Sequence, residues 1–431
     1  MSDSLRTAFV AWLALAALPA ASAVPVDTGA EAPPVDSRVA RALASAPSVG
    51  ARRARAAALH MRAGAAGALA DPTIEFGFED VSFPRWTVGT DEMSTLGVEL
   101  RQELGGFGRR GAERQAVAQE ARVLDVDVMD EARRVTLAVR TQYARLYALD
   151  AERHALDAAR DVALLLRDAG TARYGTGEAA MEPQLRAQLA LSRVDAELED
   201  LAAERAGASA DLNRWLGRDP SMSFGAFAHL PDVQLAATDL PAEALAGSIA
   251  LARQRAAIAA AEARAHLQRR SGRPNVFAAA GYANRGGFDP IIELRVGAEL
   301  PAWRHAKQAP TVGAADAEVD AARLELADLE NDVRAQAVRL RAQWVRDDAQ
   351  VHRYRNAIVP QAESALEVAR STYGAGRGDF ATVLEDLETS IAARRALFRR
   401  AAQRYITWAE IEALVHPPAP ATDATSPGGW R

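Results

Sequence analysis

The chain has 431 residues, enough for one large or two ordinary domains, and it contains no cysteine, which excludes disulfides, thiolate metal sites and cysteine nucleophiles. Its 51 basic and 57 acidic residues give a net charge of −6, which argues against a nucleic-acid-binding protein because such proteins are usually basic. Hydrophobic residues make up 49% of the chain but aromatic residues only 6%, and this Ala-rich composition favours long, closely packed helices.

The N-terminus has the pattern of a secretory signal peptide. Arg6 precedes an apolar run from Ala8 to Leu18, and Ala21-Ser22-Ala23 forms a small-x-small cleavage pattern. We therefore expect a signal peptide over residues 1–23. A membrane anchor is the alternative, although the apolar run is short for a bilayer span.

Two Tyr-Gly-x-Gly turns mark an internal repeat. They begin at Tyr174 and Tyr373, which lie 199 positions apart, and the same spacing relates Leu216 to Val415. A fixed spacing of this kind indicates one structural unit written twice. We predict a flexible lead-in, a first repeat, a connector, a second repeat and a disordered tail at residues 24–37, 38–220, 221–241, 242–416 and 417–431.

Each repeat is predicted to contain a helix, two strands, a long helix, a turn and a second long helix. Each long helix before a turn covers roughly 60 residues, which is about 90 Å at 1.5 Å per residue. The expected helices are 38–70, 109–173, 182–215, 242–270, 311–373 and 384–415, and the expected strands are 74–79, 96–102, 274–282 and 292–300.

The expected strands alternate apolar residues with polar or small ones. In 292–300, Ile292, Leu294 and Val296 share one face, and Glu293 and Arg295 share the other. The apolar face would be the core of a soluble sheet or the lipid-facing side of a membrane barrel, and periodicity alone does not choose between them.

The ordered set of these features resembles the TolC family of outer-membrane efflux proteins over nearly the whole mature length. The resemblance rests on the duplicated element order, both Tyr-Gly-x-Gly turns, the stretch from Gln102 to Arg110 after the second strand, and Leu300-Pro301 after the fourth. A lone Tyr-Gly-x-Gly turn occurs by chance, but the ordered set is specific.

The resemblance implies a mixed α and β membrane protein that forms a homotrimer. Each protomer would give four strands to one 12-stranded β-barrel in the outer membrane of a Gram-negative bacterium, and the helices would form a periplasmic α-helical barrel. The implied partners are outer-membrane lipid, a periplasmic adaptor protein and an inner-membrane pump of the RND type. No nucleic acid, cofactor or metal is implied.

The resemblance also assigns roles to the turns. The second turn and the helix after it would hold the residues that narrow the pore: Tyr373, Arg377, Asp379, Thr382 and Glu385. Two positions that usually hold aspartate in the family carry Thr382 and Glu385 here, so only one keeps a carboxylate. The adaptor-docking tip would comprise Tyr174, Gly175, Gly177, Glu178, Gly374 and Gly376.

The implied function is passive conduction of a substrate that an adaptor and a pump deliver. The pattern is most similar to the subgroup that exports heavy-metal cations, and a drug-efflux or type I secretion channel is the alternative within the family. A secreted periplasmic coiled-coil protein is the alternative from another class. We expect no enzyme, because no Ser/His/Asp context appears and Gly105–Gly108 lacks the Gly-Lys-Ser/Thr ending of a phosphate loop.

Overall fold

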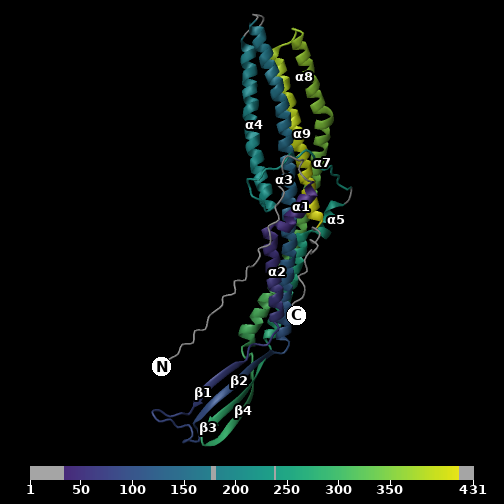
Figure 1. The fold of residues 1–431 in the computed structure, drawn as a ribbon. Coiled ribbons are helices and arrows are strands. Elements are labelled where there is room, and N and C mark those ends of the chain that lie inside the picture. The colour runs from purple at the N-terminus through teal and green to yellow at the C-terminus, as the bar shows by residue number, and fades with distance from the viewer. Residues whose placement is uncertain (1–33, 176–180, 237–238, 417–431) are drawn as a thin grey trace, which may run out of the picture.

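The computed structural model describes residues 34–175, 181–236 and 239–416. The predicted signal peptide, residues 24–33 of the predicted lead-in, and the predicted tail lie outside these residues. The described chain is elongated, with a small sheet at one end and two helical hairpin tips at the other (Figure 1).

The elements of the two repeats follow the same order. The first repeat contains α1 (Val35–Ser45), α2 (Pro47–Ala65), β1 (Thr73–Glu79), β2 (Thr95–Gly106), α3 (Arg109–Gly175) and α4 (Glu182–Trp215). The second contains α5 (Leu240–Gly247), α6 (Ile249–Ser271), β3 (Asn275–Arg285), β4 (Phe288–Glu299), the π-helical turn η1 (Arg304–Gln308), α7 (Ala309–Arg353), the π-helical turn η2 (Tyr354–Ile358), α8 (Val359–Gly374) and α9 (Phe380–Val415). With 67 residues, α3 alone runs about 100 Å at 1.5 Å per residue.

All four expected strands are present, and they form one antiparallel sheet in the order β1-β2-β3-β4. The two repeats meet in the middle of the sheet, where Val98 of β2 lies opposite Tyr282 of β3. Gly105 and Gly108, which lie where β2 turns into α3, have positive φ values of 76° and 77°. Such backbone favours glycine, so the glycines of this stretch are explained by the strand-to-helix break.

The prediction of single helices over 38–70 and 242–270 was wrong, because each stretch folds as two helices. The breaks fall at Ala46 (φ −64°, ψ 114°) and Ser248 (φ −63°, ψ 120°), which have nearly the same extended backbone. Pro47 disfavours helical backbone at Ala46. At the second break, Gly247 ends α5, and a Cβ on it would lie 1.6 Å from the carbonyl oxygen of Val415, so only glycine fits at this close approach.

The long helix of the second repeat also differs from expectation, because η2 interrupts it. Pro360 follows η2 and has no N–H to bond the carbonyl four residues earlier, and a π-helical turn relieves that conflict. The turn adds one residue, so the repeat spacing falls from 199 at the tips to 198 below η2. Buried Leu146 and Trp344, for example, are 198 positions apart.

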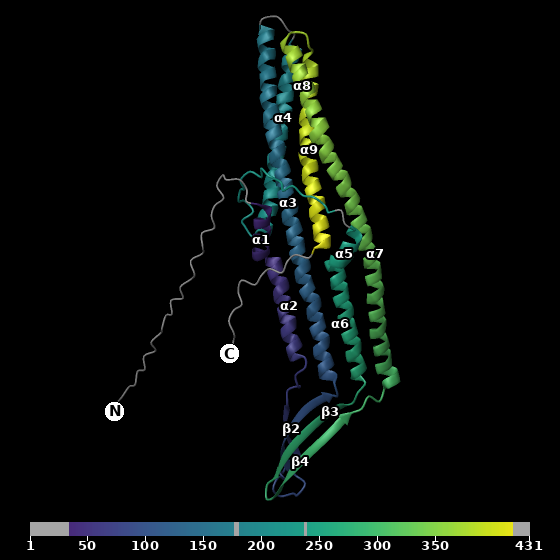
Figure 2. The ribbon, with the colours of Figure 1, turned by 90° about the vertical axis from the view of Figure 1, so that its right-hand side faces the viewer.

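Below the middle of the molecule, α2, α3, α6 and α7 lie side by side in one row (Figure 2). Side-chain contacts link neighbours: His60 of α2 is hydrogen-bonded to Asp125 of α3, and ion pairs join Arg264 of α6 to Glu120 of α3 and Arg323 of α7 to Glu262 of α6. The row has α2 and α7 at its edges. It is a single-layer wall, and both of its broad faces lack a covering layer among the described elements.

Larger apolar clusters lie above this row. One surrounds Tyr405 and Trp344 where α7 and α9 meet α5, and a second surrounds Tyr143 and Phe227. A third, near the tips, joins both hairpins through Leu191 and Leu387, among others. No helix in the described ranges is long and apolar enough to cross a membrane.

Candidate channel lining and tip

One face of the sheet is charged. The register places Glu75, Glu99 and Glu293 in one cross-strand row, with Gly281 between the last two. The next charged row contains Arg101 and Arg295 on either side of Ala279. Arg295 is ion-paired with Glu99 and lies 3.3 Å from Glu293. These five side chains line a shallow hollow of about 300 Å³.

The opposite face of the sheet is apolar and open. Phe76, Val98, Tyr282 and Ile292 form one cross-strand row on it. In β4, Leu294 and Val296 are each 81% exposed. The alternation predicted for 292–300 is therefore present, and the apolar side is not the buried core of this chain.

The turn between α8 and α9 has a defined geometry around Tyr373 and Gly376. The Arg377 N–H donates to the Thr372 carbonyl at 3.1 Å and the Gly376 N–H to the Tyr373 carbonyl at 3.0 Å. With φ of 72° at Gly376, these bonds form a Schellman cap, which needs a residue with left-handed backbone. The Tyr373 ring packs edge-on against Phe380, with ring centroids 5.4 Å apart.

The remaining predicted gate residues are exposed, and the structure brings only some of them together. Asp379 caps α9 by accepting from the Ala381 N–H at 3.2 Å, and Thr382 follows on the same side of the helix. Together with Asp386 they line a hollow of about 540 Å³ between α8 and α9. Glu385 and Arg377 lie outside this hollow, and neither has a side-chain hydrogen bond or ion pair within 34–175, 181–236 and 239–416.

Only part of the predicted docking tip can be located. Tyr174, 48% exposed, and Gly175 end α3. Gly374 ends α8, and Gly376 forms the cap described above. Gly177 and Glu178 lie outside the described residues. The two hairpin tips reach the same end of the molecule (Figure 1).

A buried charge cluster below the tip was missed at the level of sequence. Glu152 of α3 is 1% exposed, and it accepts hydrogen bonds from Arg395 at 3.1 Å and from Arg399 at 2.7 Å, both on α9. Arg395 also pairs with Glu197 of α4. The cluster thus joins both hairpins. The i, i+4 spacing of the two arginines was a visible signal, but their partner lies more than 240 positions away.

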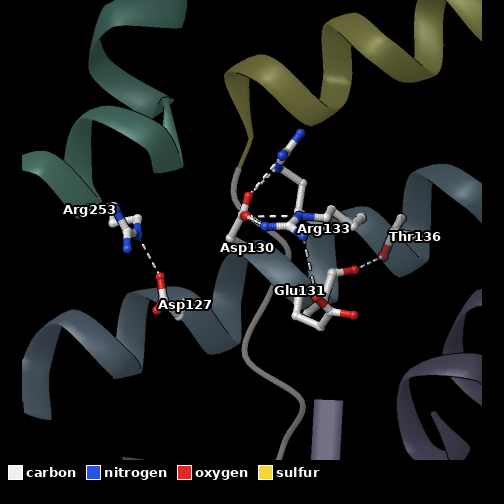
Figure 3. Close-up of polar contacts among 8 residues, drawn as sticks. Asp127, Asp130, Glu131, Arg133, Thr136 and Arg253 are labelled. Carbon is white, nitrogen blue, oxygen red and sulfur yellow. Dashed lines mark hydrogen bonds and ion pairs between the residues drawn. The ribbon is translucent and has the colours of Figure 1, made fainter. Parts of the chain in front are cut away.

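A second charged cluster lies in the middle of α3. Arg133 and Arg134 both donate to Asp130, at distances down to 2.8 and 2.5 Å, and Asp127 accepts from Arg253 of α6 (Figure 3). Burial acts to raise the pKa of Asp130, but the hydrogen bonds and charges of the two arginines outweigh it and leave the pKa below its usual value. Within the described ranges, no group of three or more His, Asp or Glu side chains is placed to hold a metal ion.

A long helical wall, a four-stranded sheet per chain and paired tips define the TolC-like fold of outer-membrane channels. The chain is similar to the outer membrane protein VceC from Vibrio cholerae (TM-score 0.70, 19% identity, 89% of this chain and 96% of that chain). It is also similar to the outer-membrane channel OprN (TM-score 0.75, 16% identity, 89% and 90%) and to CusC (TM-score 0.74, 14% identity, 89% and 92%). No family model and no curated protein sequence matches the chain.

Proposed function

We propose that this chain is one subunit of a trimeric outer-membrane channel. The two-faced sheet carries the proposal, because β1 and β4 are its unpaired edges and one of its faces is apolar and exposed. An exposed apolar sheet with free edges invites aggregation unless other copies pair with those edges and lipid covers the apolar face. Three copies would supply twelve strands, with the charged face lining the lumen.

In this proposal the helical walls of three copies form a periplasmic tube that ends at the hairpin tips. There the tips meet a periplasmic adaptor and, through it, an inner-membrane pump of the RND type. The subunit performs no chemistry and conducts passively. Tyr373, Arg377, Asp379, Thr382 and Glu385 are proposed to narrow the pore, and Tyr174, Gly175, Gly374 and Gly376 to belong to the docking surface, together with Gly177 and Glu178.

Within this role we propose metal cations as the substrate. The row of Glu75, Glu99 and Glu293 supports this choice, since rings of carboxylates at a pore attract cations. Three copies would place nine carboxylates at one level of the lumen against six arginines in the next charged row. A drug-efflux or type I secretion channel is the alternative within the same fold.

Cell fractionation tests the channel proposal against a secreted periplasmic coiled-coil protein. The channel predicts that the chain sediments with outer membranes and leaves them only in detergent. A coiled-coil protein would be released by osmotic shock as a soluble species without detergent, and that result would reject the channel.

Growth of a deletion strain tests the substrate. Export of metal cations predicts sensitivity to cobalt, zinc, cadmium or copper salts, with unchanged tolerance of dyes and antibiotics. The opposite pattern would favour the drug-efflux alternative. Reintroducing a variant with Glu75, Glu99 and Glu293 all replaced by Gln should leave the protein in the membrane while metal tolerance stays low.

A further inference from the structure

The two repeats obey two different spacings, and side-chain contacts follow both. The helix breaks at Ala46 and Ser248 are 202 positions apart, so α2 corresponds to α6 at that spacing. Buried Val135 and Val333 are 198 apart, so α3 corresponds to α7 at that spacing. Comparing the two Tyr-Gly-x-Gly turns in the sequence shows only the spacing of 199 positions at the tips.

A polar contact between neighbouring helices tests this correspondence. His60 of α2 pairs with Asp125 of α3 at 2.9 Å. The residues that correspond to them, 202 and 198 positions on, are Glu262 of α6 and Arg323 of α7, which pair at 2.7 Å. The α2–α3 contact and the α6–α7 contact are therefore one interface that occurs in both repeats.

The contact between α3 and α6 joins the first repeat to the second. Arg264 of α6 donates to Glu120 of α3 at 2.6 Å, and Arg253 donates to Asp127 at 2.7 Å (Figure 3 shows the second pair). The helix that corresponds to α3 is α7, and the helix that corresponds to α6 is α2. If the same contact recurs after the second repeat, it therefore joins α7 to α2 of a following first repeat. That following repeat must come from another copy of the chain.

The residues for this contact are present at the two edges of the wall. Glu120 corresponds to Glu318 of α7, and Arg264 corresponds to Arg62 of α2. Both are exposed, and neither side chain has a hydrogen bond or ion pair to any residue in the described part of the chain. The second pair does not recur, because Arg253 corresponds to Ala51, and Glu325, the counterpart of Asp127, accepts from Gln254.

The faces around these two residues fit one another. The exposed face of α2 repeats small residues and one methionine at spacings of four and three: Gly50, Ala54, Ala57, Met61 and Gly64. On the free edge of α7, Ala317, Ala321, Leu324 and Asp328 follow the same spacing, which is that of a helix–helix seam. Met61 is 76% exposed and Leu324 73%, so each seam carries an uncovered large apolar side chain.

The two edge helices carry opposite net charge, although Asp316, Glu325 and Glu330 of α7 also contact α6, and Arg52 of α2 lies near Asp127 of α3. α2 carries four arginines and no acidic residue, whereas residues 316–332 of α7 carry seven acidic residues and one arginine. Opposite charge on two surfaces favours their association and sets their register.

We infer that α2 of one copy packs against α7 of the next copy, with Arg62 paired to Glu318 across the subunit boundary. The occupant of the α2 face is thus a second copy of this chain, held in a head-to-tail contact that closes into a ring. The wall then contains six equivalent repeats, three joined within chains and three joined between chains. This inference rests on the proposed oligomer and specifies how its helical part closes.

A charge-swap cycle tests the pair on the full-length protein extracted in detergent. We expect Arg62→Glu and Glu318→Arg each to lower the temperature at which the oligomer dissociates to monomer, and the double variant to recover most of the loss. Arg53→Glu is the matched control, because Arg53 corresponds to Arg255, which lies next to Glu330 of α7 and away from α3. Losses that simply add in the double variant would overturn the inference.

Covalent capture gives a second, independent readout. The chain has no cysteine, so Arg62→Cys with Glu318→Cys creates the only two thiols. A short bismaleimide should link copies into dimers and trimers on a denaturing gel, and neither single-cysteine variant should form the ladder. If the wild-type protein is an oligomer but the double-cysteine variant stays monomeric on the gel, this interface alone is rejected. If the wild-type protein is a monomer, the trimeric channel is rejected as well.

Discussion

Glu152 of α3 accepts a hydrogen bond from Arg399 of α9 at 2.7 Å, although the Glu152 side chain is only 1% exposed. This bond, together with the one from Arg395, ties the α3–α4 hairpin to the α8–α9 hairpin below the tip. The hydrogen bond to Glu152 raises the pKa of Arg399, as expected for a guanidinium that donates to a buried carboxylate. Movement of one hairpin relative to the other would have to break this cluster.

Replacing Glu152 by Gln should destabilise the helical tip, because the two arginines lose a charged acceptor. A hydrogen bond to a charged group contributes roughly 1.5–3 kcal/mol, so we expect a loss of that order in the free energy of unfolding. The unfolding temperature from circular dichroism measures it. Glu388→Gln is the control: Glu388 pairs with Arg193 at 3.4 Å at an exposed site, where such pairs contribute about 1 kcal/mol or less. Equal losses in the two variants would contradict the assigned role of Glu152.

Glu410 of α9 should make the free energy of unfolding depend on pH. Burial, and then the charge of Asp347, raise the pKa of Glu410 above its usual value. An acid with a raised folded pKa favours folding most below its unfolded pKa, and this contribution is lost as pH rises through the folded pKa. Glu410→Gln should therefore raise the unfolding temperature near pH 7 and have little effect near pH 4. A lower unfolding temperature at pH 7 would contradict this.

Replacing Gly247 by alanine should destabilise the fold because the added Cβ has no room. A Cβ at this position would lie 1.6 Å from the Val415 carbonyl oxygen and 2.7 Å from its carbon, so Gly247→Ala must displace backbone where α5 meets the end of α9. We expect a loss of about 3 kcal/mol, at the upper end of typical overpacking costs. Gly207→Ala in α4 is the control, because nothing lies within 4 Å of its added Cβ and alanine favours helix by roughly 0.5–1 kcal/mol. Thermal unfolding of the two variants should move in opposite directions.

The strands were predictable because their alternation has period two, and Ile292, Leu294 and Val296 do share one exposed face. The helix breaks were not, since Ala46 and Ser248 are compatible with helix and only Pro47 gave a local signal. Glu152 could not be recognised as buried, because its two partners come from a helix more than 240 positions later. The tip turn was predicted correctly at Gly376, but the grouping of Asp379 and Thr382 with Asp386 depends on how α8 and α9 pack.

Reversing the charge of Glu385 should alter ion conduction. Glu385→Lys would place three positive charges at the proposed narrowing of a trimer, so cation preference in planar bilayers should fall. Unaltered conductance and ion preference would remove Glu385 from the gate. Glu367→Lys on α8 is the control, because Glu367 lies 3.7 Å from Arg370 and is not among the proposed gate residues.

Replacing Val296 by arginine should impair membrane insertion. Its side chain is 81% exposed on the apolar face, and an arginine on the lipid face of a barrel costs about 2–4 kcal/mol at the bilayer midplane. Val296→Arg should reduce the amount of protein in the outer membrane. Glu293→Arg, three residues earlier on the charged face, should insert normally, and equal insertion of both variants would place the apolar face elsewhere than against lipid.

The most direct test of the central claim is the native mass of the detergent-extracted protein. The 431-residue chain has a mass of 46.0 kDa. We expect a complex of three chains, each without residues 1–23, after detergent is stripped in native mass spectrometry. A mass of one chain, measured under conditions that keep the helices folded by circular dichroism, would contradict it.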